Sequence, residues 1–448
     1  MSTEIGKQAI VVGAGMGGLT GARALADFFE QVLVLENDSL PIEATPRPGT
    51  PQSKHAHALL AGGQQALSNL FPDFERSLAE AGAVTLRVTS DFRFERPACD
   101  MPQRDLGFLV YSMSRPLIEW TVRRQVAQHS NISLCDRCRA VEFVVTPDAA
   151  AVSAVRCKHS DGKAETIPAD FVVDSSGHGL LTLAALQSIG QPPPPETSVG
   201  VDIGYATATF DIPPDAPPDW KAVITLPDPP GNRRGAFLLP MEGHRWLLTL
   251  SGRYDEKPPD DWDGFLLHAQ SMRTPTVYNA IKNSKPLGGI ARFGFKASRW
   301  RHFDRLDAFP HGLLPFGDTI CRFNPVYGQG MSVASQQACL LRRLLAARAA
   351  QSDGLAGLAP TYFAEAQTII ATPWATAAIP DFVDPLTEGQ RPPDLEKTLN
   401  FSAGLFQLAL EDPEVHKVML EVQHLLKPQS AYRDPELVRR VEGLAATA

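Results

Sequence analysis

The chain begins with a strand, a glycine-rich turn, a helix and a second strand, and this pattern constrains the fold more than any other feature. Residues 8–12 form a short apolar run, which is typical of a buried parallel strand. The sequence Gly-Ala-Gly-Met-Gly-Gly follows at residues 13–18, and residues 19–29 carry apolar side chains at helical spacing. A second apolar run then ends at Glu36. This order predicts a βαβ unit of a Rossmann-like parallel sheet.

The glycine turn has the features that bind a diphosphate. Gly13 permits the tight turn, Gly15 lets the backbone approach phosphates, and Gly18 lets the helix pack close to the strand. The N–H groups at the helix start then meet the negative charge. Glu36 can accept hydrogen bonds from ribose hydroxyls and would repel a 2′-phosphate, which favours FAD or NAD over NADP. The alternative is a glycine turn without a ligand. The predicted cofactor-binding residues here are Gly13, Ala14, Gly15, Met16, Gly17, Gly18 and Glu36.

A second segment, far along the chain, supplies what a flavin needs beyond a dinucleotide. Residues 312–318 form another apolar run that ends at Asp318, whose carboxylate can accept a hydrogen bond from a ribityl hydroxyl. Asn324-Pro325 forces a turn, and a long helix is predicted over residues 331–350. The N-terminal dipole of that helix would stabilise negative charge on a reduced flavin ring. The two segments together predict FAD, with the second contributing Asp318, Pro325, Gly328, Gly330 and Met331.

Composition narrows the class of protein. With 448 residues, 44% of them hydrophobic, the chain can form two or three domains, and a net charge of −8 argues against a nucleic-acid partner. We find no signal peptide and no apolar stretch long enough to span a membrane, and the scattered cysteines are typical of a reduced, cytoplasmic protein. Cys135-Asp136-Arg137-Cys138 has no second pair at zinc-ligand spacing, so we expect no metal.

The pattern changes to short strands separated by glycine and proline turns between residues 199 and 251. This indicates an antiparallel sheet inserted into the cofactor domain, with an inner face that would roof a substrate pocket. The predicted fold class is α/β, with a Rossmann-like FAD-binding domain, an inserted antiparallel-sheet substrate domain and C-terminal helices. The predicted boundaries are 1–90, 105–190 and 290–350 for the FAD-binding domain, 91–104 and 191–289 for the substrate domain, and 351–448 for the helical region.

Two basic segments add candidate side chains. Residues 47–57 form an irregular loop in which Arg47 can neutralise a diphosphate, while its two histidines face either a ring or the surface. Arg115 follows the helix cap Ser114, where a positive charge is unfavourable for the helix and is better explained by an anionic ligand. The substrate-pocket candidates are His55, His57, Tyr205, Phe237, Leu239 and Tyr327.

On these residues the chain resembles the single-component, class A flavoprotein monooxygenases, which have a para-hydroxybenzoate-hydroxylase-like fold. Within that class it is most similar to the olefin epoxidases of polyether-ionophore biosynthesis. The resemblance covers nearly the whole chain and is sharpest at residues 51–57, 114–123, 169–174, 205–207 and 323–332. It implies that Gly13, Gly15, Gly18 and Glu36 bind the ADP half of FAD. It further implies roles at the diphosphate or ribityl chain for Arg47, Arg115 and Asp318, and at the isoalloxazine for Pro325 to Met331.

One motif departs from this class. The usual Asp-Gly motif after the third cofactor strand, with its downstream serine and arginine, is replaced by Asp174-Ser-Ser-Gly177-His178-Gly179. That motif helps to contact both FAD and NAD(P)H, so the route of hydride delivery stays open, with a separate flavin reductase as one alternative. Asp174 and His178 are either an acid–base pair or turn residues, and we favour the turn. The tryptophan motif and the lysine of flavin halogenases are not evident, which argues against halide oxidation.

The resemblance also implies a reaction. NADH or NADPH would reduce FAD, and O₂ would form a flavin C4a-hydroperoxide that transfers oxygen to a small apolar organic substrate. Epoxidation of a C=C bond needs no protein base, whereas phenol hydroxylation gains from one. No tyrosine or histidine stands out as a base, so we assign no catalytic residue and expect epoxidation of an apolar natural product by a monomer or homodimer. The alternatives are hydroxylation of an aromatic or polyketide ring and a non-redox cyclase with structural FAD.

Overall fold

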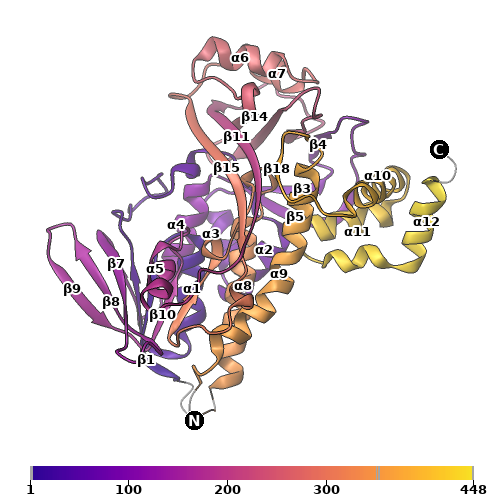
Figure 1. Cartoon of the computed structure of the whole chain (residues 1–448). Helices are drawn as coiled ribbons and strands as arrows, with labels where there is room; N and C mark the ends of the chain where they lie inside the picture. Colours follow the sequence, from indigo (N-terminus) through magenta and orange to yellow (C-terminus); the bar gives the residue numbers. More distant parts are fainter. Residues whose placement is uncertain (1–3, 350, 352–353, 446–448) are drawn as a thin grey trace.

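The computed structural model describes residues 4–349, 351 and 354–445 (Figure 1). In this part of the chain, a five-stranded parallel sheet has the order β16–β10–β1–β2–β6. The register places Ala9 between Phe171 and Val32, so β1 lies at the centre of the sheet. The predicted Rossmann-like α/β fold is confirmed. The strands are β1 (Gly6–Val12), β2 (Phe29–Leu35), β6 (Ile132–Cys135), β10 (Phe171–Asp174) and β16 (Leu313–Pro315).

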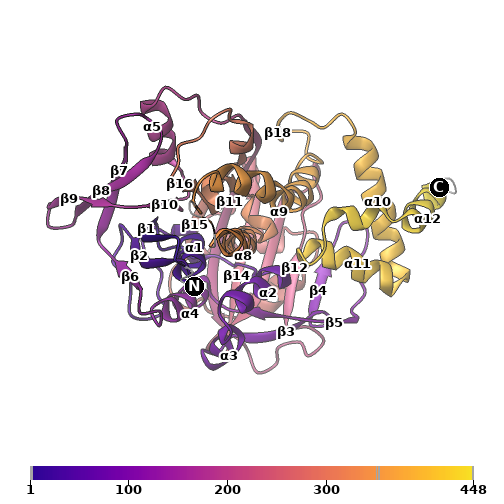
Figure 2. The same ribbon diagram turned by 90° about the horizontal axis from the view of Figure 1, so that it is seen from below.

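Alternate side chains of β1 face two different layers, as the two-residue period of a strand requires. Ala9 and Val11 pack against helices, whereas Ile10 and Val12 pack against a second, antiparallel sheet of order β7–β8–β9. Figure 2 shows the parallel sheet between that small sheet and the helices. The elements of these outer layers are α1 (Met16–Ala26), α4 (Arg115–Val126), α5 (Leu180–Ser188), α8 (Gly330–Arg348), β7 (Cys138–Val145), β8 (Val152–His159) and β9 (Ala164–Pro168).

The described residues also form an eight-stranded sheet, with the order β17–β15–β11–β14–β13–β12–β4 and β18 beside β11. Ala236 and Leu238 face α6 and α7 on its outer side, and Phe237 and Leu239 point to the opposite face. Its elements are β4 (Phe92–Glu95), β11 (Glu196–Asp211), β12 (Ala222–Thr225), β13 (Arg234–Met241), β14 (Arg245–Arg253), α6 (Trp262–Gln270), α7 (Thr276–Ile281), β15 (Ala291–Arg301), β17 (Cys321–Arg322) and β18 (Glu388–Gly389).

Two long strands join this sheet to the cofactor unit. β15 pairs with β11 from Glu196↔Arg301 to Thr207↔Ala291, although its residues fall within the range 290–350 that we assigned to the FAD-binding domain. β4 enters the same sheet by parallel pairing with β12, from Ala222↔Phe92 to Thr225↔Glu95. Figure 1 shows β11 and β15 running from the parallel sheet up to α6 and α7.

The C-terminal region is helical and extends to one side of the molecule (Figure 1, yellow). α9 packs against α8, with Tyr362 buried in the main core, while α10–α12 build a smaller core around Met101. No described helix is both long and apolar enough to cross a membrane. The remaining elements are α2 (Ala61–Leu70), α3 (Phe74–Glu80), β3 (Val84–Thr89), β5 (Asp105–Ser112), α9 (Leu358–Asp381), α10 (Leu395–Glu411), α11 (Pro413–Gln423), α12 (Pro435–Ala445), and the 3₁₀ turns η1 (Pro51–Lys54), η2 (Tyr254–Glu256), η3 (Phe303–Arg305), η4 (Gly317–Thr319), η5 (Pro325–Tyr327) and η6 (Gln429–Arg433).

Candidate cofactor and substrate site

The glycine turn between β1 and α1 is packed too tightly for side chains at two positions. Gly13 has φ of +101°, and its N–H donates to the carbonyl of Leu35 at 2.8 Å. A Cβ on Gly18 would lie 1.7 Å from the carbonyl oxygen of Gly13, so helix and turn meet only because this position is glycine. The turn therefore presents bare backbone at the N-terminus of α1, the geometry that a diphosphate requires.

The two segments that the sequence singled out lie side by side. A Cβ on Gly317 would be 3.9 Å from the Cα of Gly17, which places the start of η4 against the first turn of α1. A Cβ on Gly330 would be 3.7 Å from Oδ1 of Asp318, so this carboxylate lies next to the N-terminus of α8. Backbone of both segments thus borders one site.

Glu36, at the end of β2, has the position expected of a ribose-binding acid. Its Oε2 accepts a hydrogen bond from the N–H of Ala14 at 2.8 Å, and its Oε1 accepts one from the N–H of Asp38 at 2.9 Å. Since each carboxylate oxygen has two lone pairs, further acceptor capacity remains for ribose hydroxyls. The Glu36 side chain therefore links the end of β2 to the glycine turn by a hydrogen bond.

Arg47 and Arg115 meet at a carboxylate that we did not select from the sequence, Glu119. Arg47 pairs with Glu119 at 2.7 Å, Arg115 pairs with it at 2.9 Å, and all three side chains are buried. Burial alone would raise the pKa of Glu119, but the charges of Arg115 and Arg47 lower it overall. Glu119 lies 72 residues from Arg47, and no local pattern marks such a pairing.

The same cluster has unused donor capacity next to the glycine turn. Nη1 of Arg115 is buried without a hydrogen-bond partner among the described residues, which is costly unless a ligand supplies an acceptor. Nη2 of Arg47 lies 4.0 Å from where a Cβ of Gly15 would be. Arg47 therefore borders the backbone that would hold a diphosphate, and Arg115 is linked to Arg47 through their shared partner Glu119.

Asp318 and Met331 also lie where the second segment meets the first. Desolvation by the nearby protein raises the pKa of Asp318, although the charges of Arg322, Arg115 and Arg299 oppose this shift. Met331, in the first turn of α8, packs against the main core. No described residue donates a hydrogen bond to the Asp318 carboxylate, which lies beside the N-terminus of α8 and can accept one from a ligand.

A cavity of about 380 Å³ adjoins this region, between the eight-stranded sheet, the loop at residues 55–60 and α11. Pro325 and Gly328 of the second segment line it, and a Cβ on Gly328 would lie 2.7 Å from the Cβ of Ala58. The lining includes every substrate-pocket candidate, namely His55, His57, Tyr205, Phe237, Leu239 and Tyr327.

Burial keeps the histidines and tyrosines of this lining uncharged at neutral pH. Desolvation lowers the pKa of His55 to about 4 and that of His57 to about 3, and it raises the pKa of Tyr205 and Tyr327. His55 is fixed by a 2.7 Å hydrogen bond between Nδ1 and the hydroxyl of Thr207. These groups can donate or accept hydrogen bonds, but none is poised to remove a proton from a substrate.

One wall of the cavity comes from the C-terminal helices, and we selected none of its residues from the sequence. α9 and α11 place six side chains in the lining, and among them His416 is fully buried with neither ring nitrogen bonded to a described residue. The spacing of apolar residues in α11 indicates a helix with one buried face, but it does not indicate that this face lines the cavity. The six are Thr376, Pro380, His416, Met419, Leu420 and Gln423.

The turn after β10 is held by local hydrogen bonds. Asp174 is fully buried, accepts from the N–H of Ser176 at 3.0 Å and accepts from the hydroxyl of Thr182 at 2.6 Å. The carbonyl of His178 accepts a hydrogen bond from Arg301 at 2.8 Å. Asp174 is therefore occupied in the turn, in agreement with the interpretation that we favoured over an acid–base pair.

Comparison with solved structures defines the class of fold. The chain is similar to the flavin-dependent brominase Bmp2 (TM-score 0.67, 13% identity, 99% of this chain and 100% of that chain). It is also similar to p-nitrophenol 4-monooxygenase PnpA from Pseudomonas putida DLL-E4 (0.62, 16%, 95% and 99%) and to the Diels-Alderase PyrE3 (0.60, 17%, 94% and 80%). At these identities the likeness concerns the fold, which is that of class A FAD-dependent monooxygenases.

Sequence comparison then identifies the family. No family model matches the chain. The chain is 35% identical over 358 residues to Protein Rv3254 of Mycobacterium tuberculosis (strain ATCC 25618 / H37Rv), covering 77% of this chain and 74% of that protein. It therefore belongs to the family of Protein Rv3254.

Proposed function

We propose that the chain is an FAD-dependent monooxygenase that epoxidises a C=C bond of an apolar organic substrate carrying an anionic end. One observation carries this proposal: residues 325–329 line the apolar cavity and lead directly into Gly330, which lies beside Asp318 in the segment that meets the glycine turn. A reactive ring laid against this segment would face the cavity directly. NADH or NADPH is the proposed reductant, either directly or through a separate flavin reductase.

The residues present fit FAD. The bare backbone at Gly13–Gly18 suits the diphosphate, Glu36 the ribose and Asp318 the ribityl chain, while the unpartnered Nη1 of Arg115 supplies a charged donor. When bound, FAD supplies electron transfer and the activation of O₂, which protein side chains cannot provide. The chain itself would bind and orient the substrate and exclude water.

The titration behaviour of the cavity supports epoxidation over hydroxylation of a phenol. A base that deprotonates a phenol works best with a pKa near the operating pH. The pKa values of His55 and His57 are lowered far below that range by desolvation, and those of Tyr205 and Tyr327 are raised. Because epoxidation removes no substrate proton, neutral hydrogen-bonding groups are sufficient. The described lining also contains no lysine, which argues against halide oxidation.

Arg96 supports an anionic end on the substrate. It is the one arginine or lysine in the described lining, and the carboxylates nearest to it in sequence, Glu95 and Asp100, pair with Arg93 instead. Its guanidinium lies 4.0 Å from the centre of the Phe406 ring, and desolvation lowers its pKa. A cation at the wall of an apolar cavity is stabilised when a ligand brings a carboxylate or a similar anion.

The test is steady-state kinetics with a carboxylate substrate and its neutral methyl ester. We expect Arg96→Met to raise KM for the acid by about 10-fold or more, because one charge-assisted hydrogen bond is lost. The KM for the ester should stay unchanged. Arg96→Lys should recover part of the loss. Arg139→Met, at an exposed arginine of β7, serves as the control. Equal effects of Arg96→Met on acid and ester would refute the anionic end.

Two other functions stay in view because proteins with this fold are described by them. PnpA is a p-nitrophenol 4-monooxygenase, and PyrE3 is a Diels-Alderase. Product mass after reaction under isotopically labelled O₂ separates them: an epoxide or a hydroxylated ring gains one labelled atom, and a cyclised product gains none. A cyclised, unlabelled product without consumption of NADH or NADPH would replace our proposal by the non-redox cyclase.

A further inference from the structure

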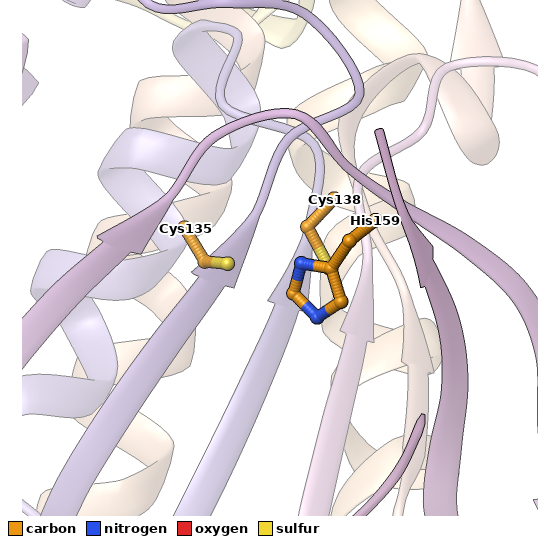
Figure 3. Close-up of side chains that lie close together, drawn as sticks. All are labelled: Cys135, Cys138 and His159. Carbon is orange, nitrogen blue, oxygen red and sulfur yellow. The ribbon is translucent and has the colours of Figure 1, made fainter. Parts of the chain in front are cut away.

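A cluster of thiols and an imidazole lies outside the cofactor and substrate site. Cys135 ends β6, Cys138 begins β7 and His159 ends β8, and Figure 3 shows the three side chains pointing toward one another. Their sulfur and ring-nitrogen atoms all lie within 4.8 Å of one another. A tetrahedral zinc ion, about 2.3 Å from sulfur and about 2.0 Å from nitrogen, needs its ligands roughly 3.5 Å apart. Small side-chain rotations would therefore close this set on an ion.

A second, independent feature is the orientation of His159. Its Nε2 lies 2.6 Å from Oε1 of Glu165, so this nitrogen carries the proton and donates to the carboxylate. The lone pair is therefore on Nδ1, which is the ring nitrogen that can bind a metal ion together with the cysteines. Histidines that bind metals almost always donate their other N–H to a carboxylate or carbonyl in this way, which fixes the tautomer and the ring.

Cys157, on β8, brings a third thiol beside this cluster: its Sγ lies within 4.8 Å of ligand atoms of His159 and Glu165. It is fully buried, and its Sγ lies 3.8 Å from Oε1 of Glu165. Its thiol also neighbours that of Cys138. Three cysteines and one histidine are a common ligand set for structural zinc.

We propose that Cys135, Cys138, Cys157 and His159 bind one zinc ion, with Glu165 as a positioning residue. The chain has no second C-x-x-C pair. The other two proposed ligands, Cys157 and His159, lie on β8, which the fold places next to the first pair. On binding, each thiol becomes a thiolate and releases its proton to solvent, and the zinc ion keeps its charge and oxidation state. Cys135 and His159 are only half-buried, which leaves a route for the ion.

A zinc ion at this site would also stabilise the end of β2, because the backbone of Glu36 is hydrogen-bonded to both Cys135 and Cys138. The N–H of Glu36 donates to the carbonyl of Cys135 at 2.9 Å, and the N–H of Cys138 donates to the carbonyl of Glu36 at 2.8 Å. An ion that fixes both cysteines would therefore fix the end of β2. We expect the metal to raise the melting temperature of the full chain, because the four assembled ligands bind it more tightly than the unfolded chain does.

The experiment is elemental analysis of the full chain, reduced, mixed with excess Zn²⁺ and freed of unbound metal by gel filtration. We expect one zinc per chain, and we expect Cys135→Ser and His159→Gln to lose it. Cys99→Ser and Cys339→Ser, at cysteines outside the cluster, should keep it. Wild type without retained zinc, or cluster variants that retain one equivalent, would overturn the proposal.

A second measurement needs no variant and therefore does not depend on variant folding. A thiol reagent is added to the native wild-type chain with Zn²⁺ and again after a strong chelator. The expected result is that the half-buried Cys135 reacts faster after chelation and that the melting temperature falls. Identical reactivity and melting temperature in both conditions would contradict a zinc site.

Discussion

At the scale of single residues, the glycine turn at residues 13–18, where we expect the FAD diphosphate to bind, depends most on Gly18. A Cβ there would meet the backbone of Gly13, which cannot move without opening the turn. We expect Gly18→Ala to abolish measurable FAD binding or to lower the yield of folded protein sharply. Gly21→Ala is the matched control, because on the same helix its nearest contact would be an ordinary 3.8 Å from Val173. Fluorescence titration with FAD measures both variants, and equal affinities would contradict the predicted cradle.

His55 gives a prediction about pH. Burial lowers its pKa from an ordinary 6.5 to about 4, so the folded state favours the neutral ring. This contribution to stability is complete above pH 6.5 and is lost as the pH falls from 6.5 toward 4, and the shift corresponds to about 3 kcal/mol. Urea unfolding across this range should show a smaller loss of stability for His55→Asn than for wild type. The same pH slope in both proteins would mean that His55 titrates normally in the folded state.

Site residues could be predicted from the sequence only where a local pattern of neighbouring residues marks them. The glycine turn and Glu36 could be predicted because strand, turn, helix and acid follow one another within a few residues of chain. Glu119 and the unpartnered Nη1 of Arg115 could not, because the ion pairs that define them join segments far apart in sequence. The substrate-pocket candidates do line one cavity, but their chemical roles stay predictions.

At the scale of elements, the last turn of α9 stabilises the second segment. Asp381 accepts hydrogen bonds from Tyr327 at 2.9 Å and from Asn324 at 3.1 Å, and it pairs with Arg253 of β14. Asp381, Asn324 and Arg253 are buried, so this network joins three elements without access to water. A C-terminal helix thus positions a loop that we place against the cofactor.

Breaking this network should be costly. We expect Asp381→Leu to lower the free energy of unfolding by about 3–5 kcal/mol, because it leaves the buried charge of Arg253 unpaired. The double variant Arg253→Met/Asp381→Leu should recover part of the loss. Glu142→Gln, in an exposed pair with Arg156, should change stability by at most about 1 kcal/mol. If urea unfolding gave similar values for Asp381→Leu and Glu142→Gln, the network would not stabilise the fold.

Elements were predictable where their period was clear. The strands around residues 8–12, 200–210 and 245–250 alternate or end in glycine, and they appear as β1, β11 and β14. The parallel pairing of β4 with β12 was not predictable, because a strand of four residues carries too little pattern to fix its partner. The place of α11 against the cavity was missed for a similar reason, since its apolar face fits any partner.

At the scale of the whole molecule, the chain returns to the parallel sheet after building the antiparallel one. β16 pairs with β10, and η4 follows directly, so the second glycine segment comes back to the first. β11 and β15 connect the two sheets (Figure 1). The apolar cavity adjoins the second segment, which contributes Pro325 and Gly328 to its lining. This arrangement explains why two segments far apart in sequence can act on one cofactor.

The central claim is that the chain binds FAD and uses it in a redox reaction. The most direct test is the visible spectrum of the purified full chain, supplied with FAD if needed, before and after anaerobic addition of NADH or NADPH with substrate or a flavin reductase. Our account predicts two flavin absorption bands that bleach on reduction and return with air. A chain that stays colourless after incubation with FAD would contradict the account.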